Sequence, residues 1–370
     1  MIPIIDLKRQ YQSIRGEVED AIRPVLEEGH FVLGDALGRF EKEMAQYLGV
    51  RHAIGVNSGT DAIYLALLSL GVGPGDDVVT TAFSMFATVE PIRLLGARPV
   101  FVDIDPKTCQ IDVTQLGPRV TKKVKAIIPV HLYGSVANMG GILELAKQRG
   151  VPVIEDAAQA VGASLHGKKA GGLGDFGCIS FYPTKNLGAY GDGGMVVTNN
   201  DELADGIRTL RHHGQTKKYV HEFIGINSRL DDLQAAVLSV KLRHLDTWNA
   251  KRREIAQRYT EAFKDLELQT PFEPEGVFHI YHQYSILVPN RDAFQQRLLE
   301  QGVSSAVHYP LALPFQPALA EFGHQRGDFP QSEGVATEVL SLPIFPEMTE
   351  QEIKSVIGAV QASLRDFANR

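Results

Sequence analysis

One lysine in a glycine-rich segment is the residue of this chain best suited to covalent chemistry. Lys185 follows a strand-like apolar run and precedes Gly188, Gly191, Gly193 and Gly194. Glycines let the backbone approach a ligand closely because no side chain intervenes. A lone lysine on such a loop is usually a solvated surface charge. Its chemistry therefore has to be judged from the residues that accompany it.

Two further features could bind the same ligand as Lys185. Asp156 ends the apolar run VPVIED, and ligands bind at the ends of strands in open α/β sheets. The segment NSGTDA places Ser58 and Thr60 where a helix begins, so free backbone N–H groups and the helix dipole favour an anion there. Each feature alone is weak, because Asp and Ser are also ordinary helix caps.

Together the three features match one ligand, pyridoxal phosphate (PLP). It carries an anion for the helix start, a ring nitrogen for Asp156 and an aldehyde for Lys185. A lysine Schiff base with an Asp at the pyridinium nitrogen is how proteins bind and tune this cofactor. Asp156 would keep the nitrogen protonated, so that the ring can absorb carbanion charge.

Composition and missing motifs exclude several other classes of function. Lys and Arg total 37 against 44 Asp and Glu, for a formal charge of -7 without a basic stretch, so no nucleic-acid partner is predicted. Neither a Walker phosphate loop nor a dinucleotide fingerprint occurs, which disfavours a nicotinamide-dependent dehydrogenase. Cys109 and Cys178 are too few for a metal or iron–sulfur site and are predicted to be core residues.

The same reading predicts a cytoplasmic protein with no membrane partner. The first twenty residues carry charges rather than a signal peptide, and no apolar run is long enough to cross a bilayer. Few cysteines fit a reducing compartment. With 370 residues, 44% of them hydrophobic, the chain is most simply one large and one smaller domain.

Strand-like and helix-like segments alternate through the first part of the chain. Helices are predicted at 12–28 and 38–48, before a first strand at 52–57, and a further helix is predicted at 86–95. Short apolar strands separated by helices predict a three-layer α/β/α domain with a mainly parallel sheet. A long helix over 230–263 leads into an α+β unit that contains a Pro-rich segment over 310–330. We place a large domain with the N-terminal helices at 1–245 and a small domain at 246–370.

The chain also resembles a known family, the DegT/DnrJ/EryC1/StrS sugar aminotransferases, which have PLP fold type I of the aspartate aminotransferase superfamily. The resemblance covers nearly the whole chain. The matching segments together are highly specific for the family, whereas each segment alone would be a weak signal. It rests on GHFVLGDALGRFEKEMAQYLGV, NSGTDAI, GVGPGDDVV, KAIIPVHLYG, VIEDAAQAVGA, SFYPTKNLGAYGDGGMVVTN, RHHGQ, GINSRLDDLQAA and AVHYPLALPFQPAL.

The resemblance implies a role for each matching position. Lys185 is the Schiff-base lysine and catalytic base, and Asp156 and Gln159 bind the ring nitrogen and ring hydroxyl. It also implies a homodimer with shared active sites, in which Asn227, or alternatively Arg229, reaches the neighbouring subunit's phosphate. The phosphate in each subunit is held by Gly59, Thr60 and Ser180.

Three assignments stay open in the sequence. In TAFSMFAT, where relatives place an aromatic residue over the cofactor ring, alignment puts Met85, and Phe83 or Phe86 could serve instead. His308 and Tyr309 of AVHYP, together with Arg229, are candidates for substrate contact. His131 either packs in the core or touches the ligand.

The resemblance implies a PLP-dependent transaminase that moves an amino group from L-glutamate to a keto-sugar. A nucleotide-linked (dTDP or UDP) 3-keto sugar is favoured, in amino-sugar biosynthesis for a surface polysaccharide or secondary metabolite. A 4-keto nucleotide sugar is the alternative. Relatives that replace the lysine with histidine perform dehydration, so Lys185 favours amine transfer. A non-catalytic regulator on the same fold is the alternative of another class.

Overall fold

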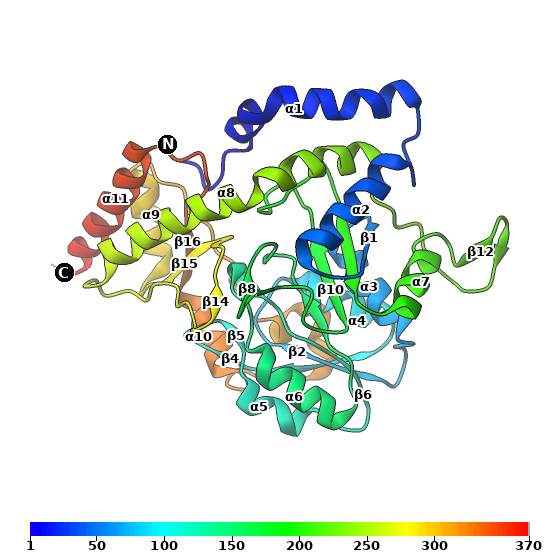
Figure 1. The fold of residues 1–370 in the computed structure, drawn as a ribbon. Coiled ribbons are helices and arrows are strands. Elements are labelled where there is room, and N and C mark those ends of the chain that lie inside the picture. Colours follow the sequence, from blue (N-terminus) through cyan, green and yellow to red (C-terminus); the bar gives the residue numbers. More distant parts are fainter. Residues whose placement is uncertain (369–370) are drawn as a thin grey trace.

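A central sheet of mainly parallel strands organises the fold (Figure 1). The computed structural model describes residues 1–368, with side chains described through residue 365. Every neighbouring pair in the sheet is parallel except where β11 pairs with β10 and β1; parallel bridges join β6 to β7. The strand order is β3 (Arg98–Val102), β2 (Asp77–Thr81), β6 (Val124–Ile128), β7 (Ile154–Asp156), β10 (Phe176–Ser180), β11 (Gly194–Thr198) and β1 (His52–Val56).

Successive side chains of a strand pack into hydrophobic cores on opposite faces of the sheet, so the sheet lies between two layers of helices. Val78 packs in one buried cluster and Val79 in the other, as expected where side chains alternate along a strand buried on both faces. The predicted α/β/α architecture is confirmed. One face is covered by α2 (Asp35–Leu48), α5 (Val113–Arg119), α6 (Met139–Arg149) and α8 (Asp232–Phe263), and the other by α3 (Gly59–Ser69), α4 (Glu90–Leu94) and α7 (Asp201–Leu210).

A second, smaller core lies around the C-terminal half of α8. There β15 (Tyr284–Leu287) pairs antiparallel with β16 (Val339–Leu342), and α9 (Arg291–Glu300) and α11 (Glu350–Ala368) pack beside them. Leu245 belongs to the large core, whereas Ile255 belongs to the small one. We therefore propose that the domains meet within α8 near residue 245. The N-terminal α1 (Leu7–Glu28) packs along the same helix (Figure 1).

One segment differs from the sequence-based expectation, and a proline is the reason. The predicted helix over 86–95 is a 3₁₀ turn, Phe86–Thr88, followed by α4, because Pro91 has no N–H and is tolerated only in the first turn of a helix. The Pro-rich segment contains two 3₁₀ turns and runs into α10 (Pro330–Glu338), which begins at a proline.

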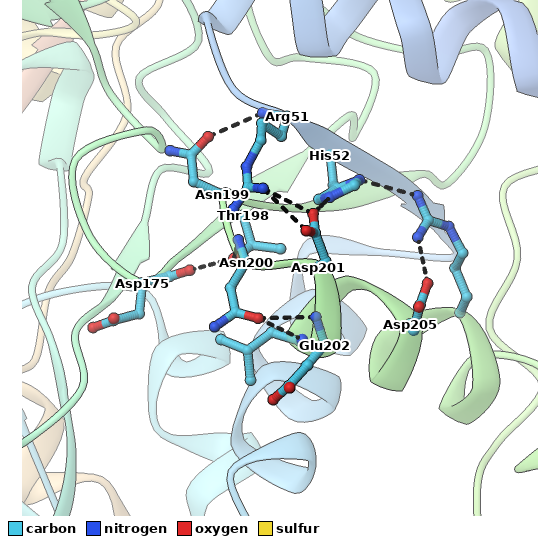
Figure 2. Close-up of polar contacts among 11 residues, drawn as sticks. Arg51, His52, Asp175, Thr198, Asn199, Asn200, Asp201, Glu202 and Asp205 are labelled. Atoms are coloured by element: carbon cyan, nitrogen blue, oxygen red, sulfur yellow. Dashed lines mark hydrogen bonds and ion pairs between the residues drawn. The ribbon is translucent and has the colours of Figure 1, made fainter.

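A polar cluster fastens α7 to the edge of the sheet (Figure 2). Arg51 and His52 both contact Asp201, with His52 Nε2 2.6 Å from Oδ1, and Asn200 caps the helix. Thr198 pairs with His52, so the cluster lies at the end of β11 and β1 opposite to Gly194. It therefore lies at the opposite end of β11 from Ser180, which pairs with Gly194.

Among the described residues, no helix combines the length and apolar character needed to span a bilayer.

Candidate active site

Two of the predicted ligand-binding residues end neighbouring parallel strands. β7 ends at Asp156 and β10 ends at Ser180, with Asp156 opposite Cys178 in the register. The carboxyl ends of parallel strands meet at one edge of the sheet, where α/β proteins bind their ligands. The sheet therefore brings a buried carboxylate and the start of the Lys185 loop together.

The start of α3 lies against Ser180. Ser58 caps the helix by accepting a hydrogen bond from the Asp61 N–H at 3.0 Å, whereas the N–H groups of Gly59 and Thr60 donate to no described residue. A Cβ at Gly59 would lie 2.8 Å from the Cβ of Ser180, so only glycine permits this approach. Gly59, Thr60 and Ser180 thus converge on a cradle suited to an anion.

Asp156 is buried and held by a threonine that the sequence did not single out. Thr88 Oγ1 donates to Asp156 Oδ2 at 2.7 Å, and the Ala158 N–H donates to Oδ1 at 3.2 Å. Burial raises the pKa of Asp156, while these hydrogen bonds and the positive charge of Lys185 oppose that rise. A cationic group placed beside this carboxylate would be strongly stabilised.

Lys185 is partly buried in a loop with several anchors. Its N–H donates to the Tyr182 carbonyl at 2.8 Å, and Lys241 Nζ of α8 donates to the Gly188 carbonyl at 2.6 Å. Burial lowers the pKa of Lys185 to about 8, against the opposing attraction of Asp156. About a tenth of this lysine is therefore an uncharged amine at pH 7, able to act as nucleophile or base.

The low pKa predicts a specific pH profile for Lys185 in the apoprotein. Only the neutral amine reacts with an acylating reagent, so the labelling rate should rise about tenfold per pH unit below pH 8 and level off above it. Peptide mass spectrometry of samples pulsed with acetic anhydride measures this rate, with Nα-acetyl-lysine, whose side-chain amine is free, as the reference. A rate that still rises at pH 10 would contradict the depressed pKa.

Gln159 links the strand end to the smaller domain. Its Oε1 accepts a hydrogen bond from the Tyr133 N–H at 2.7 Å, and its Nε2 donates to the Tyr309 hydroxyl at 3.2 Å. Burial raises the pKa of Tyr309 to about 12, so this phenol stays neutral. Tyr309 therefore lies beside Gln159, and we propose that it contacts the substrate.

Of the three candidates for the ring cover, Met85 alone has a largely free side chain. Met85 is 49% exposed, whereas Phe83 is fully buried against Tyr309 and Phe86 packs on the α3 side of the sheet. Because a fully buried ring has no face left for a ligand, Phe83 is unsuited to this role. We propose that Met85 covers the cofactor ring.

The histidines near Lys185 are neutral. Burial, helped by the charge of Lys185, lowers the pKa of His308 to about 4, and the same two causes hold the pKa of His282 well below its ordinary range. His308 Nδ1 lies 3.0 Å from Ser341 Oγ, and His282 Nδ1 lies 3.0 Å from Asn186 Oδ1. His282 was not identified from the sequence, because no motif set it apart.

His131 packs in the core. Its Nδ1 accepts a hydrogen bond from the Ala137 N–H at 3.1 Å, so Nε2 carries the proton that it shares with Glu155 Oε2 at 2.7 Å. Both side chains are fully buried. The Glu155 carboxylate also accepts hydrogen bonds from the N–H groups of Gly171, Leu173 and Gly174. These bonds fix β7 at the residue that precedes Asp156.

Truncating the Glu155 side chain should be costly for stability. Glu155→Ala leaves a buried imidazole and three backbone N–H groups without an acceptor, so we expect a loss of about 3–5 kcal/mol in the free energy of unfolding. Urea denaturation measures it, with Glu144→Ala on α6 as the control. A loss below about 1 kcal/mol, the size of a single hydrogen bond, would show that the carboxylate is not needed.

Comparisons with known proteins identify the family. Residues 12–361 match the model of the DegT/DnrJ/EryC1/StrS aminotransferase family. The chain belongs to this family, and it is a PLP-dependent aminotransferase of fold type I.

Individual relatives are similar over almost their whole length. A "pleiotropic regulatory protein" of Geobacillus stearothermophilus is 49% identical over 99% of this chain and 100% of its own. A UDP-N-acetyl-3-dehydro-alpha-D-glucosamine 3-aminotransferase of Acidithiobacillus ferrooxidans is 43% identical over 98% of each chain. The crystal structure of DesV from S. venezuelae, in complex with a ketimine intermediate, has a TM-score of 0.96 at 40% identity, covering 100% of this chain and 99% of that one.

The residues present fit PLP. The start of α3 offers unpartnered N–H groups for a phosphate, and the Gly59–Ser180 contact leaves no Cβ in the way. Asp156 offers a buried carboxylate for a ring nitrogen, and Lys185 offers an amine with a depressed pKa. No cluster of three or more His, Cys, Asp or Glu suited to a metal ion occurs among the described residues.

Proposed function

We propose that this enzyme transfers the amino group of L-glutamate to the C3 keto group of a nucleotide-linked (UDP or dTDP) sugar. The observation that carries the proposal is the meeting of Lys185 and Asp156 at the strand ends of a fold shared with nucleotide-sugar 3-aminotransferases. The relatives named for 3-keto or 3-amino sugars include both UDP-linked and dTDP-linked substrates. Their activities favour C3 over the 4-keto alternative.

The chemistry divides between the cofactor and the chain. When bound, PLP supplies the electron sink that stabilises negative charge at the donor's α-carbon. Asp156, buried and hydrogen-bonded by Thr88, would hold a proton at the ring nitrogen. The Lys185 amine, with its lowered pKa, would move the proton at the donor's α-carbon.

Other side chains would position the reactants. The N–H groups of Gly59 and Thr60 and the Ser180 hydroxyl would bind the phosphate. Gln159 Nε2 would approach the ring hydroxyl, and His308 would meet the sugar as an uncharged hydrogen-bonding group. Tyr309 would lie between Gln159 and His308. We propose these roles on the basis of their common location around Lys185.

A panel of acceptors tests the proposal. Purified protein loaded with PLP would be incubated with L-glutamate and 3-keto or 4-keto nucleotide sugars, and the amino-sugar and 2-oxoglutarate would be measured by mass spectrometry. Turnover of a 3-keto sugar at least tenfold faster than of its 4-keto isomer is expected. Preference for the 4-keto isomer would favour the alternative function, amine transfer to a 4-keto nucleotide sugar.

A regulatory function is a second candidate, because the Geobacillus relative carries that name. A regulator without catalysis would not need Lys185, Asp156 and Gln159 together. Wild-type protein that is colourless, takes up no added PLP and consumes no glutamate would favour regulation over catalysis.

We propose further that two copies of this chain share their active sites. Asn227 is exposed, and among the described residues no hydrogen bond joins its side chain to the α3 cradle of its own chain, while Arg229 Nη1 pairs with His212 Nδ1 at 3.0 Å. The nearby hairpin β12 (Gln215–Lys217) and β13 (Val220–His221) projects from the body of the molecule (Figure 1). Tyr219 is 81% and Ile224 92% exposed on this segment, as expected of a surface that a second copy covers.

A shared site predicts complementation between two inactive variants. Lys185→Ala lacks the reactive amine and Asn227→Ala lacks the group for the neighbour's phosphate, so a mixed dimer would contain one complete site. We expect mixed samples, unfolded and refolded together, to recover up to about a quarter of wild-type activity, because half of the dimers are mixed and each has one of two sites intact. Mixed dimers isolated with two affinity tags that show no activity would contradict sharing through Asn227.

A further inference from the structure

A lysine of α8 is buried against the loop that carries Lys185. Lys241 is 1% exposed. Its Nζ donates to the Gly188 carbonyl at 2.6 Å and lies 4.1 Å from the ring centroid of Tyr190. No other described residue donates to that carbonyl, and no described carboxylate is hydrogen-bonded to Lys241. The ammonium group is therefore held by a backbone carbonyl and an aromatic ring.

The burial of Lys241 is not explained by a gain in stability from its charge. Burial lowers the pKa of Lys241 to about 8, and the negative charge of Glu347 only partly offsets that lowering. At pH 7 the side chain is still mostly charged. Because the charged form is less favourable in the folded protein than in water, the charge makes folding less favourable at this pH. A methionine would fill the same space without that cost, so the hydrogen bond to Gly188 is what the lysine adds.

The Gly188 carbonyl belongs to the peptide unit that closes the turn over residues 183–188. The N–H of the same peptide unit, carried by Ala189, donates to the Phe181 carbonyl at 2.7 Å. A Cβ at Gly188 would lie 2.3 Å from the Pro183 carbonyl oxygen, so the two ends of the turn are in close contact. The peptide is thus held at its N–H by the chain that follows β10 and at its carbonyl by α8. The reactive lysine lies inside this turn.

A second side chain of α8 holds the same turn. Asn186, the residue after Lys185, donates from Nδ2 to Asn249 Oδ1 at 2.7 Å. Asn249 follows Lys241 by about two turns of the helix. One helix therefore fixes the turn at a side chain and at a backbone carbonyl. Without Lys241, the carbonyl end of the turn would be released while the Asn186 contact remained.

We propose that Lys241 is a positioning residue, which holds the Lys185 amine in place by fixing the Gly188 carbonyl. The proposal rests on the proposed function, in which that amine moves the proton at the donor's α-carbon. Lys241 acts through the backbone of the loop, because its Nζ is engaged by Gly188 and by the ring of Tyr190. Proton transfer depends steeply on geometry, and a displacement of about 1 Å can lower a rate on the order of 10²-fold.

The first test requires no turnover. In apoprotein pulsed with acetic anhydride, the midpoint of the pH profile for Lys185 labelling should move up by at least about half a pH unit in Lys241→Met. The reason is that a loosened loop lets water reach the amine and relieves its desolvation. Hydrogen exchange should become at least about tenfold faster at the N–H groups of Lys185 and Ala189 and stay unchanged in β10 and α8. Lys241→Arg, which keeps a charged donor, should recover part of both effects.

The donor half of the reaction gives a second measurement. Holoenzyme is mixed with L-glutamate without any sugar, and the absorbance change of the bound cofactor gives the maximal rate and the half-saturating concentration. Lys241→Met should lower the rate by at least about tenfold and change that concentration by less than about threefold, because the loop positions the base rather than the donor. Lys241→Gln, which is neutral and one bond shorter, tests the same point if the methionine variant does not fold. The control on the same helix, Arg258→Gln, removes an exposed ion pair with Glu350 and should change neither measurement.

Three results would overturn the positioning role of Lys241. The first is an unchanged Lys185 midpoint in every folded Lys241 variant. The second is a rise in hydrogen exchange that is as large in β10 and α8 as in the loop, because that would mean a general loosening of the fold. The third is an effect confined to the half-saturating concentration of L-glutamate. If the wild type reacts with no amino acid while Lys241→Met still shifts the midpoint, the proposed function fails and the effect of Lys241 on Lys185 stands.

Discussion

Lys185→Ala should lose transamination by at least about 10³-fold while still binding PLP. The alanine removes both the amine that holds the cofactor covalently and the base that moves the proton at the donor's α-carbon. Cofactor binding should survive, because the start of α3 and Asp156 offer their contacts without the lysine. The same substitution should leave folding intact, since the loop is anchored by its backbone and by Lys241.

The decisive measurement is single-turnover conversion of the cofactor by L-glutamate, followed spectroscopically. In the wild type, borohydride should fix the cofactor to the peptide that contains Lys185, and the variant should release it on denaturation. Lys169→Ala is the matched control, because Lys169 is also partly buried but pairs with Asp246 at 3.8 Å. Wild-type turnover in Lys185→Ala would mean that another group performs the chemistry.

Asp156→Asn should reduce turnover by about 10²-fold or more, with little change in the amount of cofactor bound. Asparagine has the same shape and can still accept from Thr88 or Ala158, but it carries no charge to keep a ring nitrogen protonated. Thr88→Val removes one hydrogen bond and keeps the charge, so its loss should be only about tenfold.

The order of turnover among these variants is the decisive result. Turnover with L-glutamate should fall from wild type to Thr88→Val to Asp156→Asn, and the absorbance of the bound cofactor should change in the same order. Asp201→Asn, in the surface cluster on α7 (Figure 2), is the control for removing a carboxylate elsewhere. Equal rates in Asp156→Asn and wild type would exclude Asp156 as the partner of the ring nitrogen.

Much of the site could be predicted because its residues mark the ends of periodic elements. Asp156 closes an apolar strand, Ser58 and Gly59 open an apolar helix, and Lys185 lies close to glycines in the loop that follows a strand. Signals that mark the ends of helices and strands are local in the sequence. The rule that ligands bind at the carboxyl ends of parallel strands then placed these residues together before any contact was known.

The partners of those residues could not be predicted, because they come from distant segments. Thr88 donates to a carboxylate 68 positions away, and it lies in a segment where a continuous helix was expected. From the sequence, His131 could either touch the bound ligand or pack in the core. The structure decides for the core, because its two ring nitrogens pair with Ala137 and Glu155. Propensity and periodicity carry no information about such pairings.

The sequence by itself determined the class of protein, and it singled out the lysine and the edge of the sheet where we propose that the cofactor binds. Only the tertiary structure decided which groups surround that lysine and in what state of charge. The reason is physical: burial shifts the pKa of Lys185 to about 8 and of His308 to about 4. Desolvation depends on how all the layers pack together.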